Sequence, residues 1–435
     1  MKKLNTSPIS GMLELLPNEQ ATFNKIKHNI GEVFRKHGFL NIETPMIDRT
    51  EILLAKAGGE TEKQIYKVIK TEETEADADQ ALRFDHTVPL ARYVVEHENE
   101  LTFPFKVSQI GRNYRGEKAQ RGRFREFYQL DIDVIGRNKL SVNYDAEVIA
   151  TLFSALEELN LPKKVVRISN RKILSGFLEE LNLNHLSAEI FNIIDHAEKV
   201  PENVTKEKLE NLGLGEENVV KITTFIGISG SLDEALFKLN EFNFRNEKFN
   251  TGIEELSLVF KRLEEKGLGE AAKVDMKIVR GLDYYTGTVF ETFLPDYKEI
   301  GSICSGGRYE NLAGHYTDQV LPGVGGSIGL TRLFFVLKET GLLNEAVEKP
   351  VDLALIPFSE NEIEFSYKLA EELRKDGKSV DLVLSEKKLG DKFSYAGKLA
   401  KFAAVIGENE ISSGEISVKN LETGKETPLD EFRKL

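Results

Sequence analysis

A chain of 435 residues with 40% hydrophobic and 30% charged residues is long enough for about three domains and too apolar to be disordered. The sequence contains no apolar run long enough for a membrane span, its N-terminal segment has no stretch of signal-peptide type, and its one cysteine, Cys304, excludes an intrachain disulfide or a multi-cysteine zinc site. These features predict a cytoplasmic protein. The net charge of −13 disfavours nucleic acid as a general partner, although a local basic segment can still attract phosphate.

The N-terminal segment predicts a helix followed by a strand. Apolar residues recur at helical spacing from Asn18 to His37, and Gly38 is typical of a residue just beyond a helix end. The run FLNIETPMI follows. Because Pro45 cannot donate a hydrogen bond to a neighbouring strand, we expect this strand at a sheet edge, a bulge or an interface. Two further strand-like runs, KQIYKVIKT and QALRFDHTV, flank the acidic stretch EETEADAD, which is typical of an exposed hairpin loop.

A basic segment precedes one strongly patterned strand. Between Lys106 and Glu126 the chain carries seven basic and two acidic residues, which form either a solvated surface or a local phosphate site. In FREFYQLDIDVIG a period of two places on a predicted core face Phe124, Tyr128, Leu130, Ile132 and Val134. The opposite, polar face is expected to line a cleft, with solvent as the alternative, and consists of Arg125, Phe127, Gln129, Asp131 and Asp133.

The rest of the chain predicts a helical segment, a second group of strands and a small α/β domain. Residues 171–250 are charged and helical in pattern, and we interpret them as an inserted module. Strand character returns at 275–294 and 300–309, and helical periodicity follows in IGLTRLFFVLKETG. After Pro350, strands alternate with helices, which predicts an α/β domain with a largely parallel sheet.

Glycine-rich patterns near residue 327 do not carry the chemistry they suggest. GGSIG matches a nucleophile elbow, but no histidine follows Ser327 in the chain, as that chemistry requires. Neither a dinucleotide loop nor a Walker loop is present, so a nucleotide would have to be held by side chains. The candidates are Arg115, Arg280 and Arg332, because guanidinium groups bind phosphate or carboxylate through paired, charge-assisted hydrogen bonds. Each arginine alone is better explained by a structural ion pair, whereas three of them near sheet elements, with glycines close by, favour a binding site.

Several separate motifs resemble those of one protein family. GRNYRGEKAQRGRFREFYQLDID resembles motif 2 of class II aminoacyl-tRNA synthetases, LPGVGGSIGLTRL resembles motif 3, and the first helix with FLNIETPMID resembles motif 1. RGLDYYTGTVFE and SGGRYENLAG are similar to the two signature blocks of histidyl-tRNA synthetases, and LRFDHTVPLARY is similar to their substrate loop. The tail GKLAKFAAVIGENEISSGEISVKNLETG resembles their anticodon-binding domain. The resemblance covers nearly the whole chain in the correct order.

The resemblance implies a fold and an activity. The expected fold is an α+β catalytic domain, 1–170 and 251–340, with a mostly antiparallel sheet flanked by helices, a helical insertion at 171–250 and a C-terminal α/β anticodon-binding domain at 341–435. The implied enzyme is a homodimeric ligase that activates L-histidine with ATP and Mg²⁺ to histidyl-adenylate and transfers it to tRNA(His). The alternative is the histidine-sensing regulatory subunit of ATP phosphoribosyltransferase, which typically lacks the anticodon domain and the intact RGLDYY block.

The resemblance also implies site residues. Arg280 and Arg115 would be catalytic, at the α-phosphate, and Arg332 would bind the γ-phosphate. Histidine would be bound by Asp85, Thr87, Arg115, Gln129, Asp133, Arg280, Tyr284 and Tyr285. ATP would be bound by Arg115, Glu117, Arg123 and Arg332. Gln120 is a candidate contact for the acceptor end of tRNA.

Within the histidine site the resemblance gives the two ends of the amino acid different partners. Asp85 and Thr87 would bind the α-ammonium group, while Asp133 and Tyr285 would bind the imidazole, whose neutral ring has one donor and one acceptor nitrogen. Aspartate at 85 and 133 replaces the glutamate of many family members. Thr331 replaces the glutamate that usually precedes the motif 3 arginine, which leaves the support of that arginine open.

Overall fold

The computed structural model describes residues 4–55, 60–72, 74, 78–120, 122–279, 285–310, 313–343 and 349–435. Two of the expected site residues, Arg280 and Tyr284, lie outside these described residues. The chain divides into one unit of Met1–Glu14 with Ile26–Leu343 and another of Leu15–Lys25 with Asn344–Leu435.

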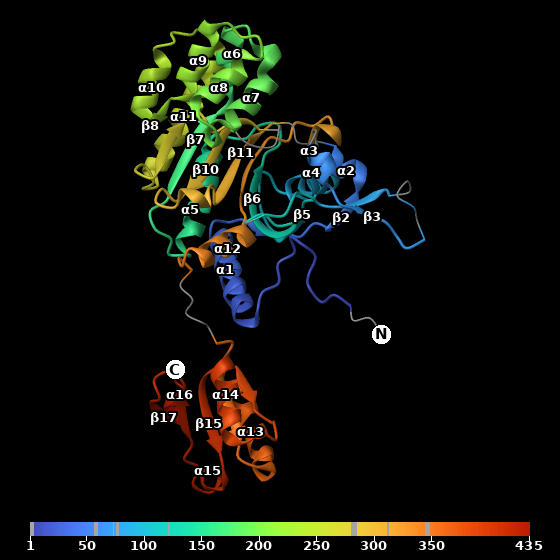
Figure 1. Cartoon of the computed structure of the whole chain (residues 1–435), viewed down its shortest axis with the longest axis vertical. Coiled ribbons are helices and arrows are strands. Elements are labelled where there is room, and N and C mark those ends of the chain that lie inside the picture. The colour runs from blue at the N-terminus through green and yellow to red at the C-terminus, as the bar shows by residue number, and fades with distance from the viewer. Residues whose placement is uncertain are drawn as a thin grey trace. The chain divides into compact units, whose positions relative to one another are not determined.

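Within the described residues, the larger unit is built on a nine-stranded sheet with the order β1-β5-β6-β12-β11-β10-β7-β9-β8 (Figure 1). Its strands are β1 Leu40–Asn41, β5 Phe105–Tyr114, β6 Glu126–Ile135, β7 Val165–Asn170, β8 Ser229–Gly230, β9 Ala272–Asp275, β10 Tyr285–Phe293, β11 Cys304–Tyr309 and β12 Gly323–Ile328. A separate small sheet has the order β2-β4-β3, with β2 Ile47–Arg49, β3 Lys67–Val68 and β4 Gln80–Leu82. The predicted hairpin is confirmed, because β3 and β4 pair antiparallel.

The large sheet is mixed, which corrects the expectation of a mostly antiparallel one. Antiparallel pairing runs from β5 to β7, whereas β1 pairs with β5 and β7 pairs with β9 in parallel. Parallel neighbours need long crossover connections. Helical segments supply them here, because α2 to α4 lie between β1 and β5 and α6 to α11 lie between β7 and β9.

Helices α5, α6, α11 and α12 of the larger unit pack on this sheet. Helix α1 Pro17–Lys36 is divided between the two units, because its residues up to Lys25 fall in the second unit and those from Ile26 onward in the larger one. The other helices of the larger unit are α2 Thr50–Leu54, α3 Glu60–Gln64, α4 Thr87–Glu96, α5 Asn143–Glu157, α6 Arg171–Glu180, α7 Ser187–Asp195, α8 Glu202–Glu210, α9 Glu216–Ile226, α10 Leu232–Asn240, α11 Glu247–Glu265 and α12 Leu330–Glu339, with 3₁₀ turns at Asn184–Leu186, Ala197–Lys199, Lys298–Ile300 and Ala313–His315. The predicted first helix is confirmed. It ends before Gly38, whose φ of +80° suits a residue without a Cβ.

Helices α6 to α10 occupy the segment predicted to be helical and gather near the β8 end of the sheet (Figure 1). A cluster of phenylalanine rings forms part of their core, with Phe177 and Phe225 ring centroids 4.4 Å apart. Phe242 and Phe249 belong to the same cluster through Phe244. These helices fall within the same compact unit as the sheet, so a separate insertion at 171–250 stays a prediction.

The second unit is an α/β fold, as expected, but its sheet is mixed rather than largely parallel, because β16 and β17 add to it as antiparallel strands. Its elements are β13 Val351–Pro357, α13 Ile363–Lys375, β14 Val380–Leu382, α14 Leu389–Leu399, β15 Ala400–Ile406, α15 Glu408–Ser413, β16 Ser417–Asn420, β17 Glu426–Pro428 and α16 Leu429–Phe432, with a 3₁₀ turn at Glu360–Glu362. The strand order is β14-β13-β15-β16-β17; β13 pairs in parallel with β14 and β15, and the remaining pairs are antiparallel. Across the described parts of both units, no helix has the length and apolarity to cross a membrane.

Strand β6 connects the core to the site. The buried side chains of Leu130, Ile132 and Val134 confirm the predicted core face. Gln129 and Asp133 line a cavity on the opposite face, so the cleft interpretation is confirmed over the solvent alternative. Phe124 departs from the predicted alternation: it precedes β6, where pleating no longer fixes its direction, and it lines a cavity too.

Candidate active site

Two adjoining cavities lie against the large sheet. The larger has a volume of about 1050 Å³ and the smaller about 270 Å³. Four residues line both of them, namely Arg115, Gln129, Ser305 and Ser327. Arg115 directly follows β5, and its backbone N–H donates to the carbonyl of Arg125 at 2.9 Å, which closes the basic loop beside both cavities. Arg115 can therefore contact a ligand in either cavity.

Six of the eight residues expected to bind histidine line the smaller cavity. They are Asp85, Thr87, Arg115, Gln129, Asp133 and Tyr285. They come from the start of α4, the end of β5, the polar face of β6 and the first residue of β10. The fold therefore brings side chains that lie up to 200 residues apart in the chain (Asp85 and Tyr285) to the wall of one cavity of about 270 Å³. Their individual roles stay predictions.

Asp133 has a partner that the sequence did not single out. The Tyr309 hydroxyl donates a hydrogen bond of 2.9 Å to Asp133 Oδ1, and both side chains are buried. The pKa of Asp133 is raised to about 7, chiefly by burial; the charges of Asp131 and Asp85 add to this rise, and the bond from Tyr309 opposes it. Tyr309 lies in the quoted block SGGRYENLAG, but no local pattern connects that block to β6. Tyr309 and Asp133 meet because β11 and β6, which are far apart in the chain, lie on either side of β12 in the sheet.

Asp85 is fixed by the helix that follows it. Its Oδ1 accepts a hydrogen bond from the Val88 backbone N–H at 3.0 Å, in the first turn of α4. Burial raises the pKa of Asp85, while the Val88 bond and the Arg115 charge lower it. A carboxylate aimed at the start of a helix is favoured by the helix dipole. Asp85 is thereby held at the cavity wall.

Asp133→Asn is expected to stabilise the protein more at pH 8 than at pH 5. Because the folded-state pKa is about 7, the unfolded chain loses this proton at lower pH than the folded chain does. The parent therefore loses stability as the pH rises from about 4 through the folded-state value, whereas asparagine does not titrate. In thermal unfolding, the gain in Tm over the parent should be larger at pH 8 by about 2 °C or more. A gain independent of pH would contradict a titrating buried carboxyl.

Glycines in β11 and β12 make room for the smaller cavity. A Cβ added at Gly325 would lie 2.0 Å from Asp133 Oδ1, and one added at Gly306 would lie 2.2 Å from the Gly325 carbonyl oxygen. Both glycines line the cavity, together with Gly326. The glycines of GVGGSIG therefore allow strands and side chains to approach closely, and they do not form a phosphate-binding loop.

All four residues expected to bind ATP line the larger cavity: Arg115, Glu117, Arg123 and Arg332. The Arg115 guanidinium lies 4.3 Å from the Phe84 ring centroid and 5.0 Å from that of Phe127, so stacking restrains it. Arg123 Nη1 is 3.2 Å from Glu117 Oε2. These contacts hold the charged groups at the cavity wall.

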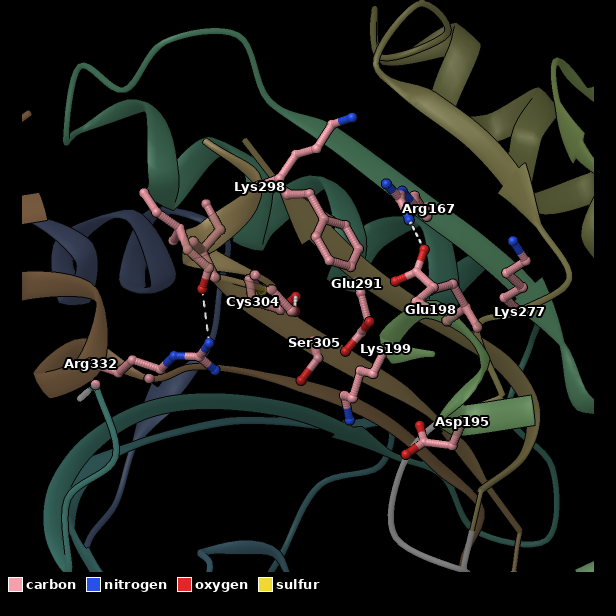
Figure 2. Close-up of a pocket in the computed structure, with 18 of the residues that line it drawn as sticks. Arg167, Asp195, Glu198, Lys199, Lys277, Glu291, Lys298, Cys304, Ser305 and Arg332 are labelled. Atoms are coloured by element: carbon pink, nitrogen blue, oxygen red, sulfur yellow. Dashed lines mark hydrogen bonds and ion pairs between the residues drawn. The ribbon is translucent and has the colours of Figure 1, made fainter. Parts of the chain in front are cut away.

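Arg332 is positioned by two contacts from outside motif 3. Its Nη2 donates to the carbonyl oxygen of Ile300 at 2.8 Å, as Figure 2 shows. The hydroxyl of the preceding residue, Thr331, accepts the backbone N–H of Tyr128 at 2.8 Å, which ties the first turn of α12 to β6. Threonine thus anchors the helix start at the position where the motif resemblance predicts glutamate.

The far side of the larger cavity carries charged residues that the sequence did not predict. Arg167 of β7 pairs with Glu198 and lies 3.3 Å from Asp275, and Figure 2 shows the Arg167–Glu198 pair across the cavity from Arg332. Lys199 and Lys277 line the same side. None of these belongs to a motif, because they come from scattered segments.

Gln120 does not lie with the cavity residues. It is exposed in the loop between β5 and β6, where its carbonyl accepts the Arg123 backbone N–H at 2.8 Å. Among the described residues, no group of three or more His, Cys, Asp or Glu side chains could hold a metal ion. Magnesium bound to a nucleotide needs only one or two protein carboxylates, however, and Glu117 and Glu291 line the larger cavity.

Comparison with known proteins identifies the family of the chain. The family model for histidyl-tRNA synthetase matches residues 11–333, and the model for an anticodon binding domain matches residues 352–434. A histidine–tRNA ligase of Clostridium tetani is 44% identical over 433 residues, which is 99% of this chain and 97% of the relative. The crystal structure of histidyl-tRNA synthetase from Nostoc sp. PCC 7120 has a TM-score of 0.88 and 37% identity, and the match covers 99% of this chain and 100% of that one.

A more distant match shares the fold alone. A Bacillus halodurans structure described as an ATP phosphoribosyltransferase regulatory subunit/histidyl-tRNA synthetase has a TM-score of 0.76 at 22% identity, covering 91% of this chain and 97% of that one. Identity at this level carries no inference about activity.

Proposed function

Since the chain belongs to the histidyl-tRNA synthetase family and is an enzyme that ligates histidine to tRNA at the expense of ATP, we propose that its smaller cavity binds L-histidine and its larger cavity binds ATP. The observation that carries this proposal is the position of Arg115 on the wall of both cavities. The histidine carboxylate and the ATP α-phosphate meet there, and both are anions. A fixed guanidinium at their junction reduces the repulsion between them.

The first step is an in-line displacement at phosphorus. A carboxylate oxygen of histidine bonds to the α-phosphorus, the bond from that phosphorus to the bridging β-oxygen breaks, and pyrophosphate leaves with the electron pair. Arg115 stabilises the charge at the reacting phosphate, and Arg332 holds the γ-phosphate so that the leaving group stays in line. Arg280 is proposed to act beside Arg115, on the strength of the family motif.

Magnesium is proposed to accompany ATP, with Glu117 and Glu291 as the carboxylates within reach of it. When bound, it would neutralise charge on the β- and γ-phosphates. Arg123 is proposed to bind ATP from the same wall.

Recognition of histidine is proposed to depend on buried polar groups at both ends of the cavity. Asp133, with Tyr285 and the family-implied Tyr284, would bind the imidazole. Asp85 and Thr87 would bind the α-ammonium group, and Gln129 would contact the amino acid from the wall that the two cavities share. A site built from buried hydrogen-bonding groups rejects analogues that leave those groups unpaired, by about 10⁴-fold or more.

The remaining proposals concern partners. The second unit is proposed to bind the anticodon of tRNA(His), and Gln120 to contact its acceptor end. A homodimer through the motif 1 region is proposed from the family; Leu40, Met46 and Ile47 there are 44–63% exposed, which is consistent with an interface. The cytoplasm is the proposed compartment.

Pyrophosphate exchange tests the catalytic proposal directly. We expect labelled pyrophosphate to be incorporated into ATP only when L-histidine is present, because adenylate formation is reversible. A regulatory subunit would bind histidine without exchange, so histidine binding without exchange would refute the proposal. Charging of tRNA(His) then tests the second step.

A further inference from the structure

A buried pair beside the histidine cavity has no role in the proposal above. His86 Nδ1 lies 2.7 Å from Asp131 Oδ2, and the two residues are 1% and 5% exposed. Asp131 also lines the smaller cavity, between Gln129 and Asp133 on the polar face of β6. With Asp131 ionised, the Nδ1–H of His86 donates this bond.

The second oxygen of Asp131 lacks a protein partner. Asp131 Oδ1 is inaccessible to solvent and has no hydrogen bond within the described structure. The neighbouring carboxylates differ, because Asp85 Oδ1 accepts from Val88 and Asp133 Oδ1 accepts from Tyr309. Buried polar atoms are nearly always paired, so an unpaired oxygen on a residue that lines a binding cavity points to a ligand as its partner.

The surroundings hold His86 in place. Its carbonyl accepts from Gln109 Nε2 at 3.1 Å and from the Leu90 backbone N–H at 3.0 Å, which fixes it at the start of α4. Gly111 leaves room for the ring, since a Cβ there would lie 3.1 Å from His86 Nε2 and 2.5 Å from Arg83 Nη2. Because His86 is fixed and bonds to Oδ2, the Asp131 carboxylate has little freedom to rotate, and the direction of Oδ1 is fixed as well.

We propose that Asp131 contacts the α-ammonium group of histidine through Oδ1, and that His86 is the positioning residue that orients Asp131 for this contact. The inference rests on the proposed histidine site. His86 follows Asp85 in the chain, so the pair brings Asp131 to the Asp85 end of the cavity. An ammonium group has three N–H donors, and Asp85 and Thr87 supply acceptors for two. Asp131 supplies the third.

The charges nearby agree with this arrangement. Burial raises the pKa of Asp85, and the negative charge of Asp131 adds to that rise, so the two carboxyls lie close enough to interact. Two carboxylates that share a small site are unfavourable without a cation. The buried Arg83 guanidinium donates to the carbonyls of Arg112 and Thr44 nearby, and a bound ammonium adds the second positive charge.

Two ligands distinguish the ammonium contact from any other role of Asp131. L-Histidine carries the ammonium group, whereas 3-(imidazol-4-yl)propionate has the same ring and carboxylate without it. In titration calorimetry of the full chain, Asp131→Asn should raise the Kd for L-histidine by about 10- to 100-fold. It should change the affinity for the deamino analogue by less than about threefold, because that ligand never used Oδ1. Equal losses for both ligands, or none for either, would overturn the proposal.

Variants at His86 test its positioning role. His86→Leu removes the donor and should reproduce the selective loss of L-histidine affinity more weakly, whereas His86→Asn keeps an N–H donor near Nδ1 and should restore affinity to within about threefold of the parent. Affinity for ATP should be unchanged in all variants. A selective loss in His86→Asn equal to that in His86→Leu would refute positioning through this bond. If His86→Leu does not fold, Asp131→Asn and His86→Asn with the ligand pair still decide the matter.

Failure of this inference differs from failure of the proposed function. If the parent protein binds no L-histidine, the proposed site is wrong. If the parent binds it and Asp131→Asn binds it equally well, only the role of Asp131 is wrong.

Discussion

Arg115→Ala is expected to reduce histidine-dependent pyrophosphate exchange by about 10²–10³-fold, the loss typical of removing one group that stabilises transition-state charge. Arg115 lines both cavities and is restrained between Phe84 and Phe127. Its guanidinium therefore needs no reorganisation when charge develops at the reacting phosphate. The measurement is the exchange rate at saturating histidine and ATP.

Arg112→Ala is the matched control. Arg112 lies on β5, three residues before Arg115, but it pairs with Glu126 at 3.2 Å and its side chain is 46% exposed. Because an exposed ion pair contributes little, exchange should stay within about fivefold of the parent. Near-normal exchange in Arg115→Ala, or an equal loss in both variants, would remove Arg115 from the reaction centre.

Gly325→Ala is expected to raise the Kd for L-histidine by about 10²-fold. Its methyl group would lie 2.0 Å from Asp133 Oδ1 and 2.8 Å from the Ile132 carbonyl oxygen. The Ile132 carbonyl oxygen belongs to the backbone and cannot move aside. The clash is therefore relieved only if the Asp133 side chain moves away from its position in the cavity. Calorimetry with L-histidine in the absence of ATP measures the effect, and thermal unfolding checks that the fold is retained.

Gly329→Ala controls for the loss of a glycine in the same run. Among the described residues, no atom beyond its two chain neighbours lies within 4 Å of a Cβ at Gly329, and Gly329 lines the larger but not the smaller cavity. Its Kd for L-histidine should therefore match that of the parent within about twofold. If Gly325→Ala also binds L-histidine normally, the smaller cavity is not the histidine site.

The local elements were predictable because each depends on neighbours in the chain. The alternation in FREFYQLDIDVIG placed Leu130 and Ile132 in the core and Gln129 and Asp133 toward a cavity, since successive strand residues face opposite ways. The first helix and its end near Gly38 were predicted for a similar reason. The motif resemblance then grouped residues such as Arg115 and Arg332, which do line one cavity.

Pairing between residues far apart in the chain could not be predicted from the sequence. The mixed sheet depends on which distant strands meet, and the pairs Tyr309–Asp133 and His86–Asp131 span 176 and 45 residues. Nothing in the period of a strand specifies its partner.

The properties of this protein therefore have two sources, the local sequence and the tertiary structure. The amino-acid sequence by itself determined the local elements, the faces they bury and the set of charged residues available for a site. Only the tertiary structure decided which carboxylates share one small cavity, which of their oxygens already have partners, and why Gly325 can be nothing larger. The physical reason is that periodicity acts over a few residues, whereas burial, pKa and steric fit depend on groups brought together by the whole fold.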